Sequence, residues 1–348
     1  MSQRATLSAR PGVDTAWDDL LVREDFNDTG QVPWPGTLCH SPDLIPAGTQ
    51  PQNAGNFLAD MNKDYGQNLV IGDNNYFYAR GINPTAAQKS GTLHLYYAPA
   101  GLLIYPSNWT ELPMETGTLG APVSADADGS FVTRSPYLWS KVSQPIGSDH
   151  YCLVSRMSTH AHPDPVPDLL QISDFAQFIA SNRGFSWRNL SQIVDPNPPQ
   201  IQQTIAYDQG CAAHEVYILL TTQNVPAGCE IAFECGTAGP RPLLDLARTE
   251  VNNSSSFVAG VYSNIPAGFS SHITYQLWTN GKTLPPNASL TLSAQYAQNP
   301  GDPELFGGVD VRTLVPEHLL APAHRAGVGI GPQPAVTLGA DRVVRVQG

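Results

Sequence analysis

The sequence predicts an all-β fold of two β-sandwiches in tandem, with one short helix in the first sandwich. Proline (31) and glycine (30) are abundant and spread without a short period, which is typical of many turns and many short strands. Short runs with two-residue alternation recur between turn signals, and long helical heptads are absent. Hydrophobic residues make up 41% of the chain, which is enough apolar material for packed cores.

The clearest strands are residues 76–80 and 92–97, joined by a polar, turn-rich connection at 81–91. With a period of two, Phe77 and Ala79 share one face of the first strand. The connection is long for a tight hairpin and ordinary for the corner of a sandwich. We therefore expect this pair to organise the first sandwich.

The same stretch resembles bacterial immunoglobulin-like modules of the cell-adhesion-related (CARDB-like) type. An aromatic strand is followed by Arg-Gly-x-Asn, a loop and a strand ending in Leu-Tyr-Tyr; Pro84 stands where such modules often have glycine. The resemblance implies immunoglobulin-like sandwiches and no enzyme. The matching residues are Arg80, Gly81, Asn83, Gly91, Tyr96 and Tyr97.

The first half divides into an N-terminal arm and a sandwich. Breakers such as Asp28-Thr29-Gly30 set off residues 1–35 as an extended arm. Residues 36–195 are expected to form the first sandwich, with long loop insertions, chiefly 107–136. Its helix should begin around Ser173 as the N-cap and end at 182–184.

A proline cluster then predicts a linker at 196–200, followed by the second immunoglobulin-like sandwich at 201–298. Residues 299–348 read as a Pro/Gly-rich C-terminal tail with a strand near 343–346. A tail of this kind has to dock, pair with a neighbour or stay mobile. Added to the sheet edge of a second copy, it would support self-association.

Charge and composition limit the kinds of molecule that the protein is expected to bind and the compartments in which it is expected to occur. The net charge is −12, and no basic stripe occurs, so nucleic acid is not an expected partner. No apolar run has the length of a transmembrane helix, and the first residues lack the apolar core of a secretory signal. We expect a cytoplasmic protein, or one exported without a cleavable signal peptide. The five cysteines are an odd number and predict free thiols.

Two sets of residues are candidates for binding. His160, His162 and Asp164 have side chains suited to a metal ion, although no further histidine follows at a motif spacing and a polar loop is the simpler interpretation. Trp34 and Trp109 lie in loops, where an exposed indole can anchor a partner or a sugar, although a packed loop is more common.

Catalytic signatures such as G-x-S-x-G or a P-loop are absent from the sequence. The sequence favours a non-catalytic bacterial interaction or assembly module, which builds a homo-oligomer or part of a larger particle, with no cofactor. One alternative is a toxin-like protein that binds a host surface, either a glycan or a membrane, after export without a classical signal. A second alternative is a metal-dependent hydrolase that uses the histidine pair.

Overall fold

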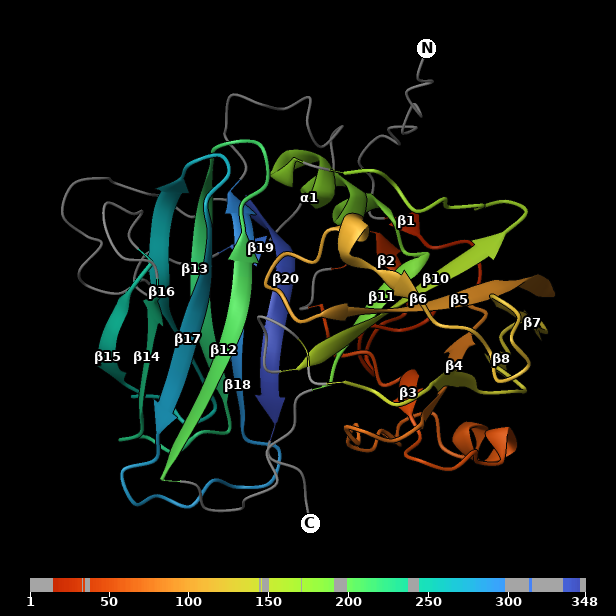
Figure 1. Ribbon diagram of the computed structural model, residues 1–348, viewed down its shortest axis with the longest axis horizontal. Helices are drawn as coiled ribbons and strands as arrows, with labels where there is room; N and C mark the ends of the chain where they lie inside the picture. The colour runs from red at the N-terminus through yellow and green to blue at the C-terminus, as the bar shows by residue number, and fades with distance from the viewer. Residues whose placement is uncertain are drawn as a thin grey trace.

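A computed structural model shows a mostly β protein with one α-helix, which confirms the all-β, sandwich-type fold class (Figure 1). The number of domains stays a prediction. The described residues are 15–32, 34, 38–143, 145, 150–169, 171–190, 199–236, 244–297, 313–314 and 334–344.

The first half holds two sheets and the helix. One sheet contains β3 (Leu44–Pro46), β4 (Asn75–Ile82), β8 (Ser130–Val132) and β9 (Tyr137–Trp139). The other contains β5 (Lys89–Pro99), β6 (Thr110–Glu111), β7 (Ala121–Ala125), β10 (Tyr151–Thr159) and β11 (Phe185–Asn189). The remaining elements are β1 (Thr15–Ala16), β2 (Gln31–Val32), the 3-10 turns η1 (Ala54–Leu58) and η2 (Pro106–Asn108), and α1 (Ile172–Ser181).

The two organising strands, β4 and β5, belong to opposite sheets, as expected of a sandwich corner. Their predicted alternation is present, because Phe77 and Ala79 pack with Leu93 and Leu95 in one buried cluster between the sheets. Burying apolar side chains from both sheets is the main stabilising contribution to such a sandwich.

The segments predicted as an N-terminal arm and as a loop insertion both contribute to the sheets and core of the first half. In the segment predicted as an arm, Leu20 and Val22 lie in the core between the sheets. Leu21 exchanges two main-chain hydrogen bonds of 2.9 Å with Ile82 of β4. The predicted insertion 107–136 supplies β6, β7 and β8 to the two sheets.

Helix α1 packs against both halves: it lies against β20, and the ring of Phe178 lies 4.8 Å from that of Phe185 in β11. Phe175, Phe178 and Ile179 are buried, as their helical spacing predicts. The predicted N-cap was wrong, because Gln171 occupies that position with an extended backbone and no capping side-chain bond. Its neighbour Ile172 is buried, so the helix begins two residues earlier to bury one more apolar side chain.

The second half is a sandwich of two antiparallel sheets with the orders β12-β17-β14-β15 and β16-β13-β18-β20-β19. Their bounds are β12 (Gln200–Asp208), β13 (His214–Gln223), β14 (Glu230–Cys235), β15 (Leu246–Glu250), β16 (Ser256–Ile265), β17 (Ser270–Trp278), β18 (Ser289–Ala297), β19 (Thr313–Leu314) and β20 (Pro334–Val344). Of the predicted linker, 196–198 lie outside the described residues, and Gln200 already belongs to β12.

The strand order of this sandwich is that of a jelly roll, completed by the last strand of the chain. In an immunoglobulin sandwich the first two strands pair, whereas here β12 pairs with β17, and β13 pairs with β16 and β18. β20 takes the position beside β18 that the first strand of a jelly roll would fill. Strand β20 of the tail thus pairs within its own chain, between the two halves (Figure 1).

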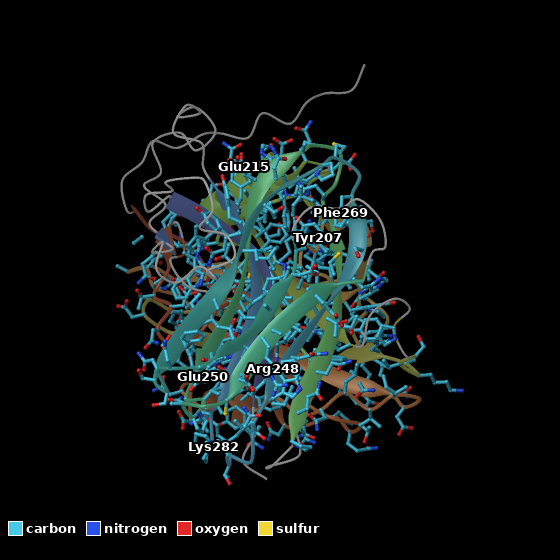
Figure 2. The ribbon with its side chains drawn as sticks, turned by 90° about the vertical axis from the view of Figure 1, so that its left-hand side faces the viewer. Tyr207, Glu215, Arg248, Glu250, Phe269 and Lys282 are labelled. Carbon is cyan, nitrogen blue, oxygen red and sulfur yellow. The ribbon has the colours of Figure 1, made fainter. Side chains whose placement is uncertain are left out.

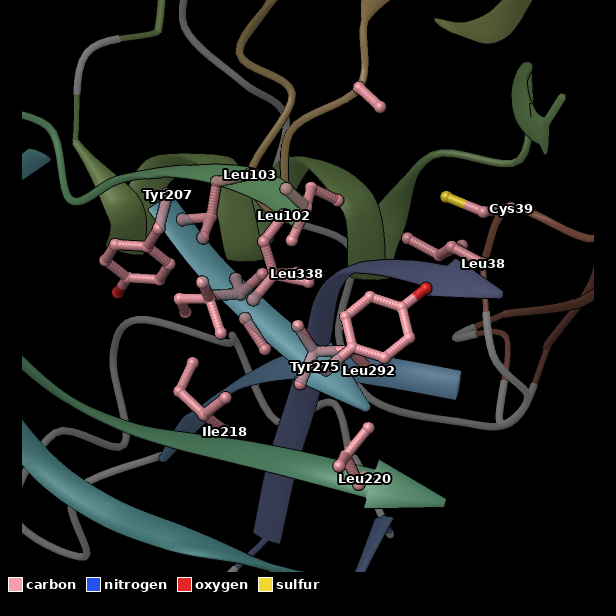
Figure 3. Close-up of a cluster of buried hydrophobic side chains, with 14 of the residues drawn as sticks. Leu38, Cys39, Leu102, Leu103, Tyr207, Ile218, Leu220, Tyr275, Leu292 and Leu338 are labelled. Carbon is pink, nitrogen blue, oxygen red and sulfur yellow. The ribbon is translucent and has the colours of Figure 1, made fainter. Parts of the chain in front are cut away.

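One hydrophobic core runs from the first half into the second. It includes Val154 of β10, Phe175 of α1, Ile218 of β13 and Leu338 of β20. Figure 3 shows Leu102, from the loop after β5, beside Leu338 in this core. The main chain is joined there as well, since the Leu102 amide donates to the Ala206 carbonyl at 2.8 Å.

Candidate functional site

The predicted metal ligands do not form a metal-binding group. His162 Nε2 lies 2.7 Å from Asp18 Oδ1, and its ring lies 4.3 Å from the ring of Trp17. His160 is exposed, and Asp164 adopts a left-handed backbone beside Gly184. Within the part of the chain that the structure describes, no three or more His, Cys, Asp or Glu side chains are placed to hold a metal ion.

The two predicted aromatic anchors both pack against the shared core. Trp34 lies under the Arg183 guanidinium, with the carbon of that group 5.3 Å from the ring centroid. Trp109 donates from Nε1 to the Ile104 carbonyl at 3.1 Å and lies within 6 Å of the rings of Tyr96 and Phe185. Each indole keeps only part of its surface exposed, because the rest packs against the core. Neither is therefore the freely exposed anchor that the loop sequence suggested.

The residues that carry the family resemblance have structural roles. Arg80 is fully buried and donates from Nε to Asp43 Oδ1 at 2.8 Å. Its other nitrogens donate to main-chain carbonyls between residues 42 and 63, including those of Phe57 and Lys63. The Asn83 amide likewise donates to three carbonyls, one of them at Ala125. These bonds fix loops to β4 and leave no group free for a ligand.

A second buried network, which the sequence did not reveal, joins the N-terminal segment to the end of α1. The carboxylate of Asp28 accepts from the Glu24 amide at 2.8 Å and from the Arg183 guanidinium. Glu24 itself has no exposed surface, and its Oε1 accepts from the Trp187 amide at 3.3 Å. Burial raises the pKa of Glu24 well above its ordinary value, against the opposing charge of Arg183.

A third network ties β20 to both halves through Asp341, which has no exposed surface. Its Oδ2 accepts from the hydroxyl of Tyr275 in β17 at 2.7 Å, and Asn189 of β11 donates to Oδ1. His150 Nε2 lies 3.1 Å from the same Oδ1. Burial acts to raise the pKa of Asp341, but the charge of His150 and the bonds from these neighbours lower it below the ordinary value. Because every member of this network is buried, we assign it to stability.

The outer face of the sheet β12-β17-β14-β15 is the regular surface that the C-terminal sandwich turns to solvent. Alternation places apolar side chains such as Ile205, Phe233 and Tyr275 inward. The side chains on the outward positions are mostly polar and at least partly exposed. We call this set the outer face: Gln202, Thr204, Glu230, Arg248, Glu250, Thr274, Gln276 and Trp278.

The outer face is preorganised by cross-strand contacts. Arg248 Nη2 lies 2.7 Å from Glu230 Oε2, and the carbon of its guanidinium lies 4.3 Å from the ring centroid of Trp278. Gln276 donates to Gln202 across the strand pair at 3.0 Å. Such contacts hold long side chains in one conformation, which lowers the entropy that a partner's binding would cost.

Both signs of charge are present on and beside the outer face. Arg248 and Lys282 are positive, and Glu230 and Glu250 are negative; Figure 2 shows three of these labelled on the side of the molecule that faces the viewer. A hydrogen bond from Asn280 lowers the pKa of Glu230; burial opposes this shift and Arg248 strengthens it, so the carboxylate stays ionised. Tryptophan and arginine are also enriched at the centres of protein interfaces.

Comparisons with known proteins add no family. No protein-family model matches the chain, and no curated protein matches it. Among solved structures, a transglutaminase of red sea bream matches with 11% identity over 81% of this chain and 30% of that chain, at a TM-score of 0.19. The secreted serine protease VesC of Vibrio cholerae matches with 7% identity over 68% of this chain and 48% of that chain, at a TM-score of 0.19.

An allantoicase matches with 9% identity over 76% of this chain and 87% of that chain, at a TM-score of 0.20. The chain thus spans less than half the length of the transglutaminase and protease structures. Similarity at this level carries no argument about fold or function. Among the described residues, no helix has the length and apolar character needed to cross a membrane.

Proposed function

We propose that the protein is a non-catalytic assembly module whose copies associate through the outer face. The observation that carries this proposal is the cross-strand network of Arg248, Glu230 and Trp278 on an exposed, regular sheet. Around it lie charges of both signs, so the same surface on a second copy is complementary when the two are related by a two-fold axis.

The C-terminal tail is the less suitable route for self-association. Residues 335–344 of β20 already pair with β18 of the same chain, and Leu338 and Asp341 are buried. Addition to the sheet of another copy would first break these contacts. The outer face needs no such rearrangement, since its side chains are already ordered at the surface.

The test is sedimentation equilibrium of the full chain over a wide concentration range, with Arg248→Glu as the variant. Wild type is expected to form a dimer, and reversing this charge should weaken the dimer at least about tenfold, equivalent to ~1.4 kcal/mol. Arg134→Glu is the matched control, because Arg134 is exposed on the first half and carries the same change of charge.

A monomer at all concentrations, or equal association of wild type and Arg248→Glu, would contradict the proposal. The outer face would then be assigned to a partner other than a second copy. Circular dichroism of both variants keeps loss of folding separate from loss of association.

A further inference from the structure

A second cluster of functional side chains lies on the first half, at the rim of the aromatic group around Trp109. Arg156 of β10 stands opposite His94 of β5 and opposite Phe185 of β11 in the sheet register. Residues directly opposite one another on neighbouring strands point to the same face, so these three side chains form one row. The next row on that face contains Tyr96 and, opposite it on β6, Glu111.

The imidazole of His94 is held in one position. Its Nδ1 lies 2.6 Å from Oε1 of Glu111, which reaches it diagonally from the next row. Gly120 also packs against the ring, where a Cβ would lie 2.9 Å from His94 Cε1. Both His94 and Glu111 stay partly open to solvent, with 17% and 24% of their side chains exposed.

Arg156 differs from the buried arginines described above, because it has no carboxylate bound to it. Among the described residues none forms an ion pair with it, and its buried Nε has no hydrogen-bond partner. Asp164 is near enough to feel its charge, yet burial raises the pKa of Asp164 against the effects of His162, Asn182 and Arg156. A guanidinium is always charged and favours a planar anion that it can bind with two nitrogens.

An apolar surface adjoins this charge. It consists of Trp109, which is supported by two buried rings: Phe185, beside Arg156, lies 5.6 Å from the Trp109 ring and Tyr96 lies 5.8 Å from it. Trp109 is itself only partly buried. A ligand with both an anionic group and an apolar body would therefore find contacts for each part in neighbouring rows of the sheet.

We infer that this rim, formed by Arg156, His94 and Trp109, binds an organic carboxylate with an aromatic or apolar body. The carboxylate accepts from the guanidinium of Arg156, while the body packs against the exposed part of Trp109. This site lies on the first half, away from the outer face, so it is independent of the assembly that we propose there.

Isothermal titration calorimetry of the full chain with benzoate tests this inference, with benzyl alcohol as the neutral analogue. Benzoate should bind at least tenfold more tightly than benzyl alcohol, because only benzoate supplies an anion to Arg156. Arg156→Gln should weaken benzoate binding at least tenfold. Arg134→Gln, an exposed arginine on the same half, is the control and should leave it unchanged.

Arg156→Lys keeps the charge and loses the two-pronged geometry, so it should weaken benzoate binding less than Arg156→Gln does. If Arg156→Gln fails to fold, Arg156→Lys takes its place as the variant in which benzoate binding is measured. Absence of benzoate binding to wild type overturns the inference. So does equal binding of the two analogues, or an affinity that neither Arg156 variant changes.

Discussion

Two buried carboxyl groups of this protein have pKa values that their surroundings shift in opposite directions. Asp341 accepts hydrogen bonds from Tyr275 and Asn189 and faces His150, which together favour the ionised form. Glu24 shares its site with the carboxylate of Asp28 and has a single main-chain donor, the Trp187 amide, so its neutral form is favoured. Burial acts to raise both pKa values, and the larger number of hydrogen-bond donors and the charge of His150 around Asp341 account for the opposite direction of its shift.

The raised pKa of Glu24 predicts the direction of one pH effect. In the unfolded chain Glu24 loses its proton near the ordinary pKa of a carboxyl group, whereas in the folded protein it keeps the proton to higher pH. The free energy of unfolding therefore falls as pH rises above the ordinary value. Glu24→Gln, which is neutral at every pH, should remove this loss.

Urea unfolding at about pH 5 and about pH 8 measures the effect. The drop in unfolding free energy between the two pH values should be smaller in Glu24→Gln than in wild type by at least ~1 kcal/mol, roughly one unit of pKa. Glu115→Gln, at an exposed position, is the control and should behave as wild type. Equal drops in wild type and Glu24→Gln would show that the Glu24 carboxyl ionises in the folded protein as it does in the unfolded chain.

Among the elements, strands with a clear alternation of apolar and polar residues could be predicted from the sequence. The neighbouring strands with which they pair in the sheets could not. In β18 the apolar residues Leu290, Leu292 and Tyr296 alternate with polar ones and lie in the core, although the polar residues between them are buried as well. A period of two reveals which face is apolar, because that property is local. Pairing is not local: β4 and β5 follow one another in the chain yet lie in opposite sheets, and β20 pairs with a strand that ends at residue 297.

For the candidate sites, too, the local features could be predicted from the sequence, and the contacts between distant segments could not. Trp34 and Trp109 were correctly placed in loops, but the neighbours that half-bury them come from distant segments, such as Arg183 and Phe185. The row of His94 and Arg156 depends on the register of β5 and β10. The sequence contains no signal for that register, since neither strand is joined to the other by a tight turn.

Strand β20 should be sensitive to one added methyl group at Gly339. A Cβ at this position would lie 2.0 Å from the Leu102 carbonyl oxygen, so Gly339→Ala forces main chain apart where the halves meet. We expect a loss of ~1–3 kcal/mol of unfolding free energy, as for other overpacked positions. Hydrogen exchange of β18 and β20 amides should also become faster.

Gly236→Ala is the matched control, because the nearest atom to its Cβ would be the His272 carbonyl oxygen at 3.6 Å. Its effect on unfolding should stay within about 0.5 kcal/mol. If Gly339→Ala is as stable as this control, β20 does not contact the loop after β5 as closely as the structure places it.

At the scale of the whole molecule, the two halves share structure that independent domains would not need. The core cluster that contains Leu338 also contains Val154 and Phe175 of the first half. The Tyr105 hydroxyl donates to the Gln209 carbonyl at 3.1 Å, and Asp341 bonds to strands of both halves. Separating the halves would expose this apolar surface and leave buried polar groups without partners.

We therefore expect one cooperative unfolding transition in differential scanning calorimetry, with the calorimetric enthalpy close to the van't Hoff enthalpy. Leu102→Ala removes a fully buried side chain at the point where the halves meet. It should lower the unfolding free energy by ~2–5 kcal/mol and shift that single transition as a whole. Val70→Ala, at an exposed position of the first half, is the control and should leave it in place. Two separate transitions in wild type, or a shift of only part of the transition in Leu102→Ala, would mean that the halves fold independently despite their common core.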